Sequence, residues 1–359
     1  MSRAPMSSVT DPGPVAVPPV GRPLGSGRSR QGAPLRIAVL IPCYNEALSI
    51  AEAVAGFATA LPAAAIYVYD NNSDDDTATI ARRAGAIVRH EGLRGKGNVV
   101  RRMFADIEAE IYILVDGDGT YDPAAAPAMV ELLLDRRLDM VTATRVPAAA
   151  GAYRAGHQFG NALLTGVVRT IFGRGVSDML SGYRAFSRRF VKSFPALAAG
   201  FETETEFTVH ALELRMPIGE VPTPYGERPP GSVSKLRTYA DGLRILRTIL
   251  VLVKEERPLQ FFSATAALLL VAALAFGVPV ISGFLQTGLV PRLPTAVLAT
   301  GLVLLSCLSA TCGLILDSVT RGRRELKRLS YLAIPSPAGC DDAWPTEAPP
   351  APFARRAGD

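Results

Sequence analysis

The chain has 359 residues, of which 48 % are hydrophobic and 20 % are charged. This composition excludes an intrinsically disordered protein, and the length is sufficient to bury a full core. The net charge of +5 arises mainly in residues 1–35 and 317–333, so the main body carries no basic stripe and nucleic acid is excluded as a partner. The four cysteines and three histidines lack metal-ligand spacing, which excludes a structural zinc site and indicates a reducing, cytosolic environment.

Residues 1–35 are rich in Pro, Gly, Ser and Arg and lack the apolar stretch of a signal peptide, so we predict a disordered leader. After this segment, short β-type runs alternate with helical stretches. The predicted strands are 36–41, 66–70, 86–88, 111–115 and 138–144, and the predicted helices are 46–61, 75–84, 96–109 and 123–137. This alternation predicts an α/β domain with a Rossmann-like, mostly parallel sheet between helices.

The alternation weakens after Thr144. The sequence predicts helices over 154–172 and 202–215. Residues 221–234 contain four prolines and two glycines, which predicts a loop of a length typical of a lid. Residues 236–255 have the apolar spacing of an amphipathic helix, which we expect to lie along a membrane surface.

Two uncharged runs, residues 259–291 and 293–316, are separated only by Arg292. Each exceeds the roughly 20 residues that cross a bilayer, which predicts two transmembrane helices; a buried core hairpin is the alternative. The mean hydropathy of +0.22 agrees with lipid-embedded segments. Basic residues flank the pair, so the positive-inside rule predicts cytoplasmic termini and a cytoplasmic α/β domain on the plasma (inner) membrane.

The segment VDGDGT, residues 115–120, ends the fourth predicted strand. Its carboxylates, Asp116 and Asp118, are one residue apart, and its glycines let a ligand approach the backbone. This arrangement suits a hard cation shared with a diphosphate, because Mg²⁺ takes one or two protein carboxylates and fills its other positions with phosphate and water. A common Asp-Gly turn is the alternative.

Three further polar clusters follow predicted strands, at residues 42–46, 70–73 and 94–97. A parallel sheet would bring them to the same edge as Asp116, where ligands of open α/β sheets bind. Tyr44 could stack on a base, Asp70 could accept from a base or ribose, and Lys96 could approach a phosphate from a helix start. Each cluster also has a structural explanation: a cap before Glu46, an Asx turn at Asp70, and a solvated basic face around Lys96. Their shared edge favours a nucleotide-diphosphate site.

The order of these motifs resembles family-2 glycosyltransferases, and within them the polyprenyl-phosphate glycosyltransferases, which include dolichol-phosphate mannose synthases and their undecaprenyl relatives. The matching segments are, in order, PCYNE, DNNSDDDT, RGKG, DGDGTYDP, TATR, SGYRAF and VPTPYGERPPGSVSKL, within residues 36–254. The resemblance implies a GT-A fold and inverting transfer of a sugar from a UDP- or GDP-linked donor to undecaprenyl or dolichyl phosphate, for cell-envelope glycan assembly. It also implies a Mg²⁺ or Mn²⁺ cofactor.

The residues at the strand ends and the resemblance together predict a donor site. Its candidates for nucleotide-sugar binding are Pro42, Tyr44, Asn45, Glu46, Asp70 and Lys96. Asp116 and Asp118 match the family's metal and diphosphate pair. Arg145, at the end of the fifth predicted strand, matches an arginine placed near the phosphates.

The resemblance also implies an acceptor site. Arg228 and Lys235 match the mobile loop that closes over donor and lipid phosphate, and Arg154 and His157 are the other acceptor-phosphate candidates. Glu206 matches a glutamate on the helix before the loop. His157 and Glu206 are also base candidates, with a structural or solvated role as the alternative. A phosphate monoester is already ionised near neutral pH and needs no strong general base.

This chain departs from the family pattern at several positions. Asn71 stands where a second Asp is frequent, and Thr120 stands where mannose synthases have Gln. The GSVSK stretch is one residue longer than the usual GESK. Arg154 aligns with the family's acceptor arginine only if Gln158 replaces a serine, and aligning on Asn161 places His157 there instead.

The predicted domain organisation has six segments: a leader 1–35, a GT-A catalytic domain 36–235, a juxtamembrane helix 236–257, two transmembrane helices 258–316, a basic cytoplasmic helix 317–333 and a disordered tail 334–359. Two other functions remain open. One is a glycosyltransferase acting on a sugar or glycolipid hydroxyl, which would need a general base. The other is a non-catalytic, nucleotide-binding membrane scaffold. The oligomeric state is left open.

Overall fold

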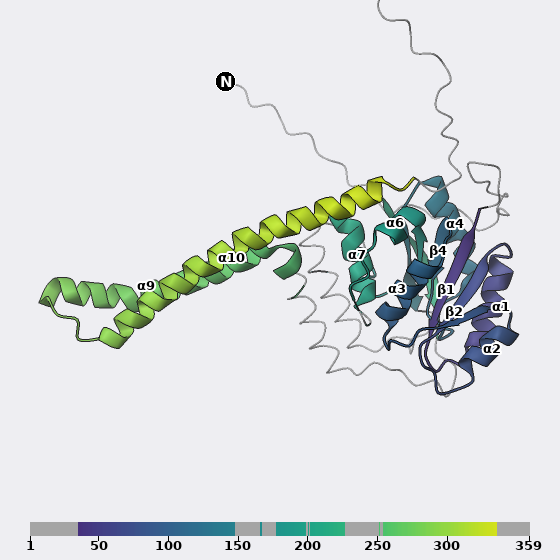
Figure 1. Ribbon diagram of the computed structural model, residues 1–359, viewed down its shortest axis with the longest axis horizontal. Coiled ribbons are helices and arrows are strands. Elements are labelled where there is room, and N and C mark those ends of the chain that lie inside the picture. The colour runs from purple at the N-terminus through teal and green to yellow at the C-terminus, as the bar shows by residue number, and fades with distance from the viewer. Residues whose placement is uncertain are drawn as a thin grey trace, which may run out of the picture.

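The computed structural model of the protein describes residues 35–147, 166, 177–198, 200, 202–226, 251 and 254–335. Figure 1 shows an α/β domain from which two long helices extend as a hairpin. Several predicted segments lie wholly or largely outside the described residues: the leader, the helix 154–172, the loop beyond residue 226, the amphipathic helix and the tail. The predicted domain boundaries therefore stay predictions.

Seven strands form one sheet, in the order β3-β2-β1-β4-β6-β5-β7. Their bounds are β1 Ile37–Cys43, β2 Ala65–Asp70, β3 Ile87–His90, β4 Ile111–Leu114, β5 Met140–Pro147, β6 Arg184–Ser187 and β7 Ile218–Tyr225. Strand β6 runs antiparallel to β4 and β5, whereas all other neighbouring pairs are parallel. The prediction of a mostly parallel α/β sheet is confirmed.

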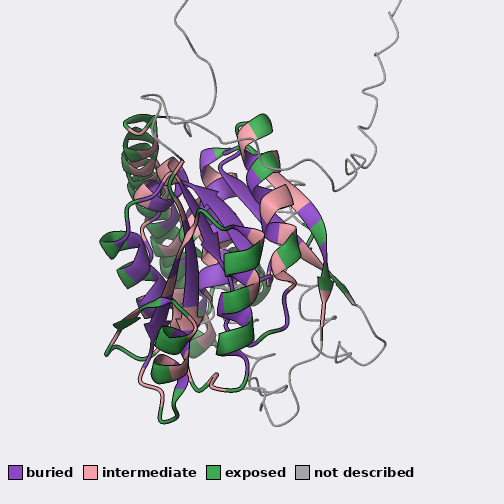
Figure 2. Cartoon of the chain, turned by 90° about the vertical axis from the view of Figure 1, so that its right-hand side faces the viewer, coloured by how far each residue is buried: buried purple, intermediate pink, exposed green. Residues whose placement is uncertain are grey.

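Helices cover both faces of this sheet, which leaves the central strands buried (Figure 2). The helices of the domain are α1 Ile50–Ala60, α2 Thr77–Arg83, α3 Lys96–Asp106, the 3₁₀ turn η1 Pro123–Ala125, α4 Ala126–Asp135, α6 Arg188–Ser193 and α7 Thr203–Leu214. Alternate residues of β1 belong to two separate cores, because side chains alternate across a strand. Val39 packs with the core of α1 and α4, and Leu40 packs with that of α3, α6 and α7.

The prediction of a loop over residues 221–234 is wrong for its first part, since residues 221–225 belong to β7. The prolines that favoured a loop, Pro222 and Pro224, lie on the last strand in the order of the described sheet, which is paired with β5. Proline cannot donate a ladder hydrogen bond, but an edge strand tolerates it where the missing N–H would face outward. Strand β6 and helix α6 were not predicted, because both are short and lie between segments without clear periodicity.

Two C-terminal helices, α9 Pro258–Thr287 and α10 Leu293–Leu332, form the hairpin. Both are long and apolar enough to cross a membrane, and only 6 % and 17 % of their most apolar stretches are buried. The alternative of a buried core hairpin therefore does not fit. The two helices contact each other through small residues, as where Ser306 Oγ donates to the Ala266 carbonyl at 2.8 Å. Helix α10 continues without a break into the predicted basic cytoplasmic segment.

The C-terminal end of α10 docks on the α/β domain. The Arg324 and Lys327 side chains lie 3.1 and 2.7 Å from the two carboxylate oxygens of Glu213 on α7. One helical turn further on, the Tyr331 hydroxyl donates to Asp139 Oδ2 at 2.8 Å, and the guanidinium of Arg189 lies over the Tyr331 ring. The hairpin is thus joined to the domain by side-chain contacts as well as by the chain itself.

Candidate active site

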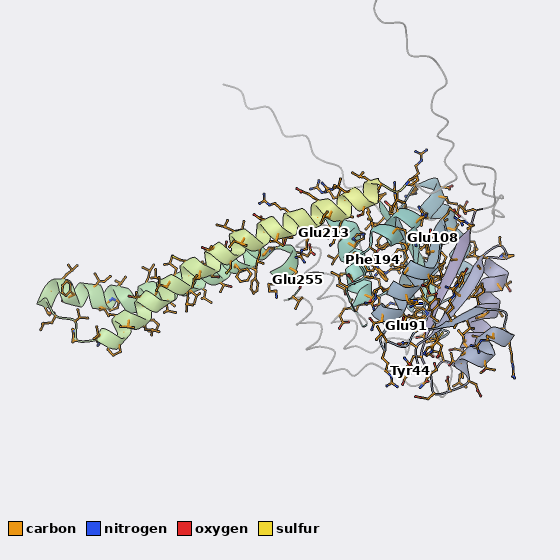
Figure 3. All side chains as sticks on the ribbon, viewed as in Figure 1. Tyr44, Glu91, Glu108, Phe194, Glu213 and Glu255 are labelled. Atoms are coloured by element: carbon orange, nitrogen blue, oxygen red, sulfur yellow. The ribbon has the colours of Figure 1, made fainter. Side chains whose placement is uncertain are left out.

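The parallel strands bring the predicted clusters to one edge of the sheet. Strands β1, β2 and β4 are adjacent, and each leads at its carboxyl end into one of the polar segments. Figure 3 shows Tyr44, after β1, and Glu91, after β3, at the same end of the domain. This edge is where ligands of open α/β sheets bind.

Asp70, the last residue of β2, has a buried oxygen that lacks a partner. Its Oδ2 accepts from the Ser73 backbone N–H at 3.4 Å and lies 3.4 Å from His90 Nδ1. Its Oδ1 is buried and has no hydrogen-bond partner among the described residues. Buried polar atoms are almost always bonded, so Oδ1 is an acceptor that a ligand donor could satisfy. This observation supports the predicted contact between Asp70 and a base or ribose.

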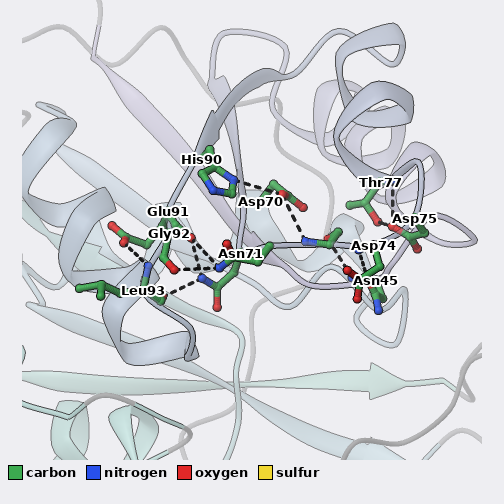
Figure 4. Close-up of polar contacts among 12 residues, drawn as sticks. Asn45, Asp70, Asn71, Asp74, Asp75, Thr77, His90, Glu91, Gly92 and Leu93 are labelled. Carbon is green, nitrogen blue, oxygen red and sulfur yellow. Dashed lines mark hydrogen bonds and ion pairs between the residues drawn. The ribbon is translucent and has the colours of Figure 1, made fainter.

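The Asn45 side chain ties the loop after β1 to the loop after β2 (Figure 4). Its Oδ1 accepts from the Asp74 backbone N–H at 2.8 Å, while the Asn45 backbone N–H donates to Ser73 Oγ at 2.9 Å. Its φ of +53° is a conformation that asparagine tolerates better than most residues. Glu46 is tied to the same loop, because its N–H donates to Thr77 Oγ1 at 2.9 Å. Asn45 therefore has a structural role at the edge in addition to its predicted one.

Asn71 connects β2 to the segment that leads into α3 (Figure 4). Its amide nitrogen donates to the carbonyls of Glu91 and Leu93, both at 2.8 Å, and its amide oxygen accepts from the Gly95 N–H at 2.8 Å. A carboxylate at this position could accept from Gly95 but could donate to neither carbonyl. The departure from the family's usual Asp thus has a structural reason.

Asp116 and Asp118 follow β4 and have different environments. Asp118 is buried, and its Oδ1 accepts from the Thr120 N–H at 3.2 Å and from Thr120 Oγ1 at 2.6 Å. The Asp116 side chain is 31 % exposed, and its Oδ1 contacts the Lys96 ammonium. Within the described ranges, no group of three or more His, Cys, Asp or Glu side chains forms a metal cluster. Two oriented carboxylates nevertheless fit Mg²⁺ or Mn²⁺, because such ions in phosphate sites complete their shell with phosphate and water.

Lys96, the first residue of α3, has an 8 % exposed side chain between two carboxylates. Its Nζ contacts Asp116 Oδ1 and lies 2.5 Å from Glu204 Oε1 on α7. Burial alone would lower the pKa of Lys96, but the two carboxylates outweigh burial and raise that pKa, so the ammonium stays charged. The structure therefore places Lys96 at the predicted edge but in contact with carboxylates.

The resemblance indicated Glu206 on α7, and no sequence pattern indicated Glu204. The Glu206 carboxylate accepts from the backbone N–H groups of Leu197 and Ala198, at 2.8 and 2.9 Å. It closes the turn before α7, which favours the structural alternative over a catalytic base. Residues two apart on a helix point to different sides, so only the orientation of α7 decides which glutamate reaches the site.

Arg145 is held by Asp178, a partner that no sequence pattern indicated. The guanidinium forms two parallel contacts with the Asp178 carboxylate, both at 2.7 Å, and lies over the Tyr225 ring. Burial would raise the pKa of Asp178, but the hydrogen bonds and charge of Arg145 lower it below its usual range. The Gly226 N–H donates to the Thr120 carbonyl at 2.9 Å, so the end of β7 lies beside the Asp118 loop.

Four predicted acceptor residues lie outside the described residues: Arg154, His157, Arg228 and Lys235. Their roles stay predictions. Arg228 follows Gly226 by two positions, and the Gly226 N–H is bonded to the loop that carries Asp116 and Asp118.

Comparison with known proteins agrees with this geometry. The family described as Glycosyl transferase family 2 matches residues 38–194. Glycosyltransferase AglJ of Haloferax volcanii is 32 % identical over 237 residues, which cover 64 % of this chain and 76 % of that protein. The chain belongs to glycosyltransferase family 2.

Other relatives of this family-2 glycosyltransferase extend the comparison. An uncharacterised protein of Shigella flexneri is 57 % identical over 155 residues, covering 43 % of this chain and 95 % of that protein. A dolichyl-phosphate hexose transferase of Haloferax volcanii is 27 % identical over 221 residues, covering 62 % and 95 %. The crystal structure of glucosyl-3-phosphoglycerate synthase from Mycobacterium tuberculosis, with Mn²⁺, UDP-glucose and phosphoglyceric acid, has a TM-score of 0.50 at 23 % identity, covering 60 % of this chain and 79 % of that one. That structure shares the GT-A fold.

Proposed function

We propose that this family-2 glycosyltransferase transfers a sugar, with inversion, from a nucleotide-diphosphate donor to a polyprenyl phosphate. The observation that carries the proposal is the combination of a two-carboxylate edge site with an apolar hairpin docked on the same domain. A donor site alone fits many acceptors, but the hairpin favours an acceptor that lies in a membrane. The dolichyl-phosphate hexose transferase among its relatives supports the same acceptor class.

The donor half of the site uses the strand ends. Asp70 Oδ1 would accept from the base or ribose, and Tyr44 and Pro42 would line the nucleotide. Asp116 and Asp118 would hold Mg²⁺ or Mn²⁺, which when bound would neutralise charge on the diphosphate leaving group. The crystal structure of the glucosyl-3-phosphoglycerate synthase described above contains Mn²⁺ with UDP-glucose, which supports a divalent ion and a UDP-linked donor; a GDP-linked donor is the other candidate.

The acceptor half needs little base catalysis. Near the site, Glu204 is engaged by Lys96 and Glu206 is engaged by two backbone N–H groups. A sugar hydroxyl would need a carboxylate able to remove its proton, whereas a phosphate oxygen is already ionised near neutral pH. Because these two carboxylates are already bonded within the protein, a phosphate acceptor is favoured over a hydroxyl acceptor. Arg145, Arg228 and Lys235 would neutralise the phosphates by electrostatic stabilisation.

The test measures transfer to lipid by the full chain in detergent, with Mn²⁺ or Mg²⁺. Labelled UDP- and GDP-sugars are offered with undecaprenyl phosphate, and with undecaprenol as the matched acceptor that lacks only the phosphate. We expect labelled lipid from one donor with the phosphate acceptor alone, and loss of product with a chelator or in the Asp118→Asn variant. Transfer to undecaprenol at the same rate, or no lipid product with any donor, would overturn the proposal.

A further inference from the structure

Lys96, Asp116 and Glu204 form a buried chain of ion pairs, here called the lysine bridge. It joins three elements: the start of α3, the loop after β4 and the start of α7. The Lys96 and Glu204 side chains are only 8 % and 7 % exposed, whereas the Asp116 side chain is 31 % exposed. Only the Asp116 end of the bridge is therefore open to a ligand.

Two glycines allow the bridge to form. A Cβ on Gly97 would lie 2.1 Å from the Ala198 carbonyl oxygen, so only glycine lets the start of α3 approach the segment before α7. A Cβ on Gly182 would lie 2.2 Å from Asp116 Oδ2 and 3.1 Å from Lys96 Nζ. Gly97 thus allows the two helix starts to come close together, and Gly182 leaves the space that the ammonium and the Asp116 carboxylate occupy.

The bridge also explains why Lys96 is poorly suited to contact a phosphate directly. Moving its ammonium toward a ligand would leave Glu204 charged, buried and without its cation, and a buried unpaired charge is strongly destabilising. With the ammonium in place, one oxygen of Asp116 is held while the carboxylate keeps its exposed side. This geometry is typical of an outer-shell partner that orients a metal ligand.

We propose that Lys96 and Glu204 are positioning residues, which fix the Asp116 carboxylate for the metal-bound diphosphate. Glu204 acts through Lys96, since its side chain forms an ion pair with that ammonium and is only 7 % exposed. This role rests on the proposed function for the identity of the ligand. It reassigns Lys96 from contact with the donor phosphate to orientation of the acidic pair.

The experiment measures Mn²⁺ affinity of the full chain in detergent by electron paramagnetic resonance, alone and with UDP or GDP. The variants are Lys96→Met, Glu204→Gln and the double variant. Lys96→Met alone leaves the carboxylates of Asp116 and Glu204 to repel each other, and the double variant removes this repulsion. Glu206→Gln is the matched control, because Glu206 lies on the same turn of α7 but accepts hydrogen bonds from the backbone N–H groups of Leu197 and Ala198 instead of pairing with Lys96. Thermal melts monitor folding of every variant.

We expect Lys96→Met to weaken Mn²⁺ binding about 10- to 100-fold, the usual range for loss of an outer-shell partner. Glu204→Gln weakens it less, and the double variant binds no more weakly than Lys96→Met, because contacts made through a shared residue are not additive. Glu206→Gln lowers the melting temperature but leaves Mn²⁺ affinity unchanged.

Several outcomes would overturn the inference. Wild-type Mn²⁺ affinity in both Lys96→Met and the double variant removes the positioning role and leaves the proposed function intact. If adding Glu204→Gln to Lys96→Met weakened Mn²⁺ binding further, by as much as Glu204→Gln does alone, Glu204 would contact the ligand itself. Wild-type protein that binds Mn²⁺ but makes no lipid product contradicts the proposed function alone, whereas wild-type protein that binds no Mn²⁺ contradicts both.

Discussion

At the scale of single residues, hydrogen-bond chemistry explains choices that a motif does not. Position 71 requires a side chain that donates twice and accepts once, since it lies between two carbonyls and one N–H group. Asparagine meets this requirement and aspartate does not. At Asp118, Thr120 donates twice to one carboxylate oxygen, and the negative charge strengthens both hydrogen bonds.

The first prediction concerns Asn71→Asp. We expect the variant to lose about 2–4 kcal/mol of unfolding free energy, because the buried side chain loses both hydrogen bonds that it donates and a carboxylate then faces the carbonyls of Glu91 and Leu93. Denaturant unfolding of the protein in detergent measures the loss. Asn72→Asp is the matched control: Asn72 donates to the carbonyls of Glu91 and Gly92, but it is only half-buried, so water can replace its bonds. Equal losses in the two variants would contradict the argument.

At the scale of elements, α7 links the active site to the hairpin. Its first turn carries Glu204 in the lysine bridge, and its last turn carries Glu213, which binds Arg324 and Lys327 of α10. The buried face between them packs on Phe190 of α6 and on Phe194 directly after it, and both rings lie edge-on to His210. One helix thus contacts both the site and the apolar hairpin.

The second prediction concerns the pH dependence of this packing. Burial, helped by the charge of Lys327, lowers the pKa of His210 to about 3, whereas an unfolded histidine has a pKa of about 6.5. Because the folded pKa is depressed, the contribution of His210 is full above the unfolded pKa and is lost as pH falls from about 6.5 toward 3. At pH 5 this loss is about 2 kcal/mol.

The variant that tests this pH dependence is His210→Phe, which keeps a ring against Phe190 and Phe194 but cannot take a proton. Its melting temperature is expected to fall less between pH 7 and pH 5 than that of the wild type. Comparison at pH 8, where His210 is neutral in both states, separates this effect from the loss of the 3.2 Å contact with Ser193 Oγ. Parallel curves for the two proteins would show that His210 does not carry the effect.

At the scale of the whole molecule, the hairpin and the domain differ in how much apolar surface they expose. The domain buries its apolar residues in two cores, whereas α9 and α10 leave large apolar side chains exposed, among them Leu268, Val271, Leu285 and Leu304. At about 1.5 Å per residue, the 30 residues of α9 extend about 45 Å, enough to cross a hydrocarbon core of about 30 Å. Figure 1 shows the domain at one end of this hairpin.

The third prediction concerns orientation. In a variant with serine at positions 307, 312 and 340, Leu289→Cys lies in the turn between the helices and Ala333→Cys lies at the end of α10. Because basic residues follow the second apolar run, we expect an impermeant maleimide to label Leu289→Cys in intact spheroplasts and Ala333→Cys only after permeabilisation. The reverse pattern would place the domain outside the cytoplasm. Extraction of the unmodified protein by alkaline carbonate would contradict membrane insertion.

The sequence by itself determined the features that depend on local pattern. Alternating strands and helices, polar clusters at strand ends and two long apolar runs together predicted the α/β class, the edge that gathers Asp70 and Asp116, and the hairpin. These predictions succeeded because strand and helix periods are local, and because parallel strands must share a carboxyl edge.

The tertiary structure alone decided which distant side chains meet. Lys96 and Glu204 are 108 positions apart, and no local period shows that α7 turns Glu204 rather than Glu206 toward the site. The partnership of Arg145 with Asp178 and the docking of α10 on Glu213 likewise depend on how separate elements pack. The local sequence pattern therefore predicts the mostly parallel fold. The electrostatic partners of the site depend instead on packing between residues that are far apart in the sequence.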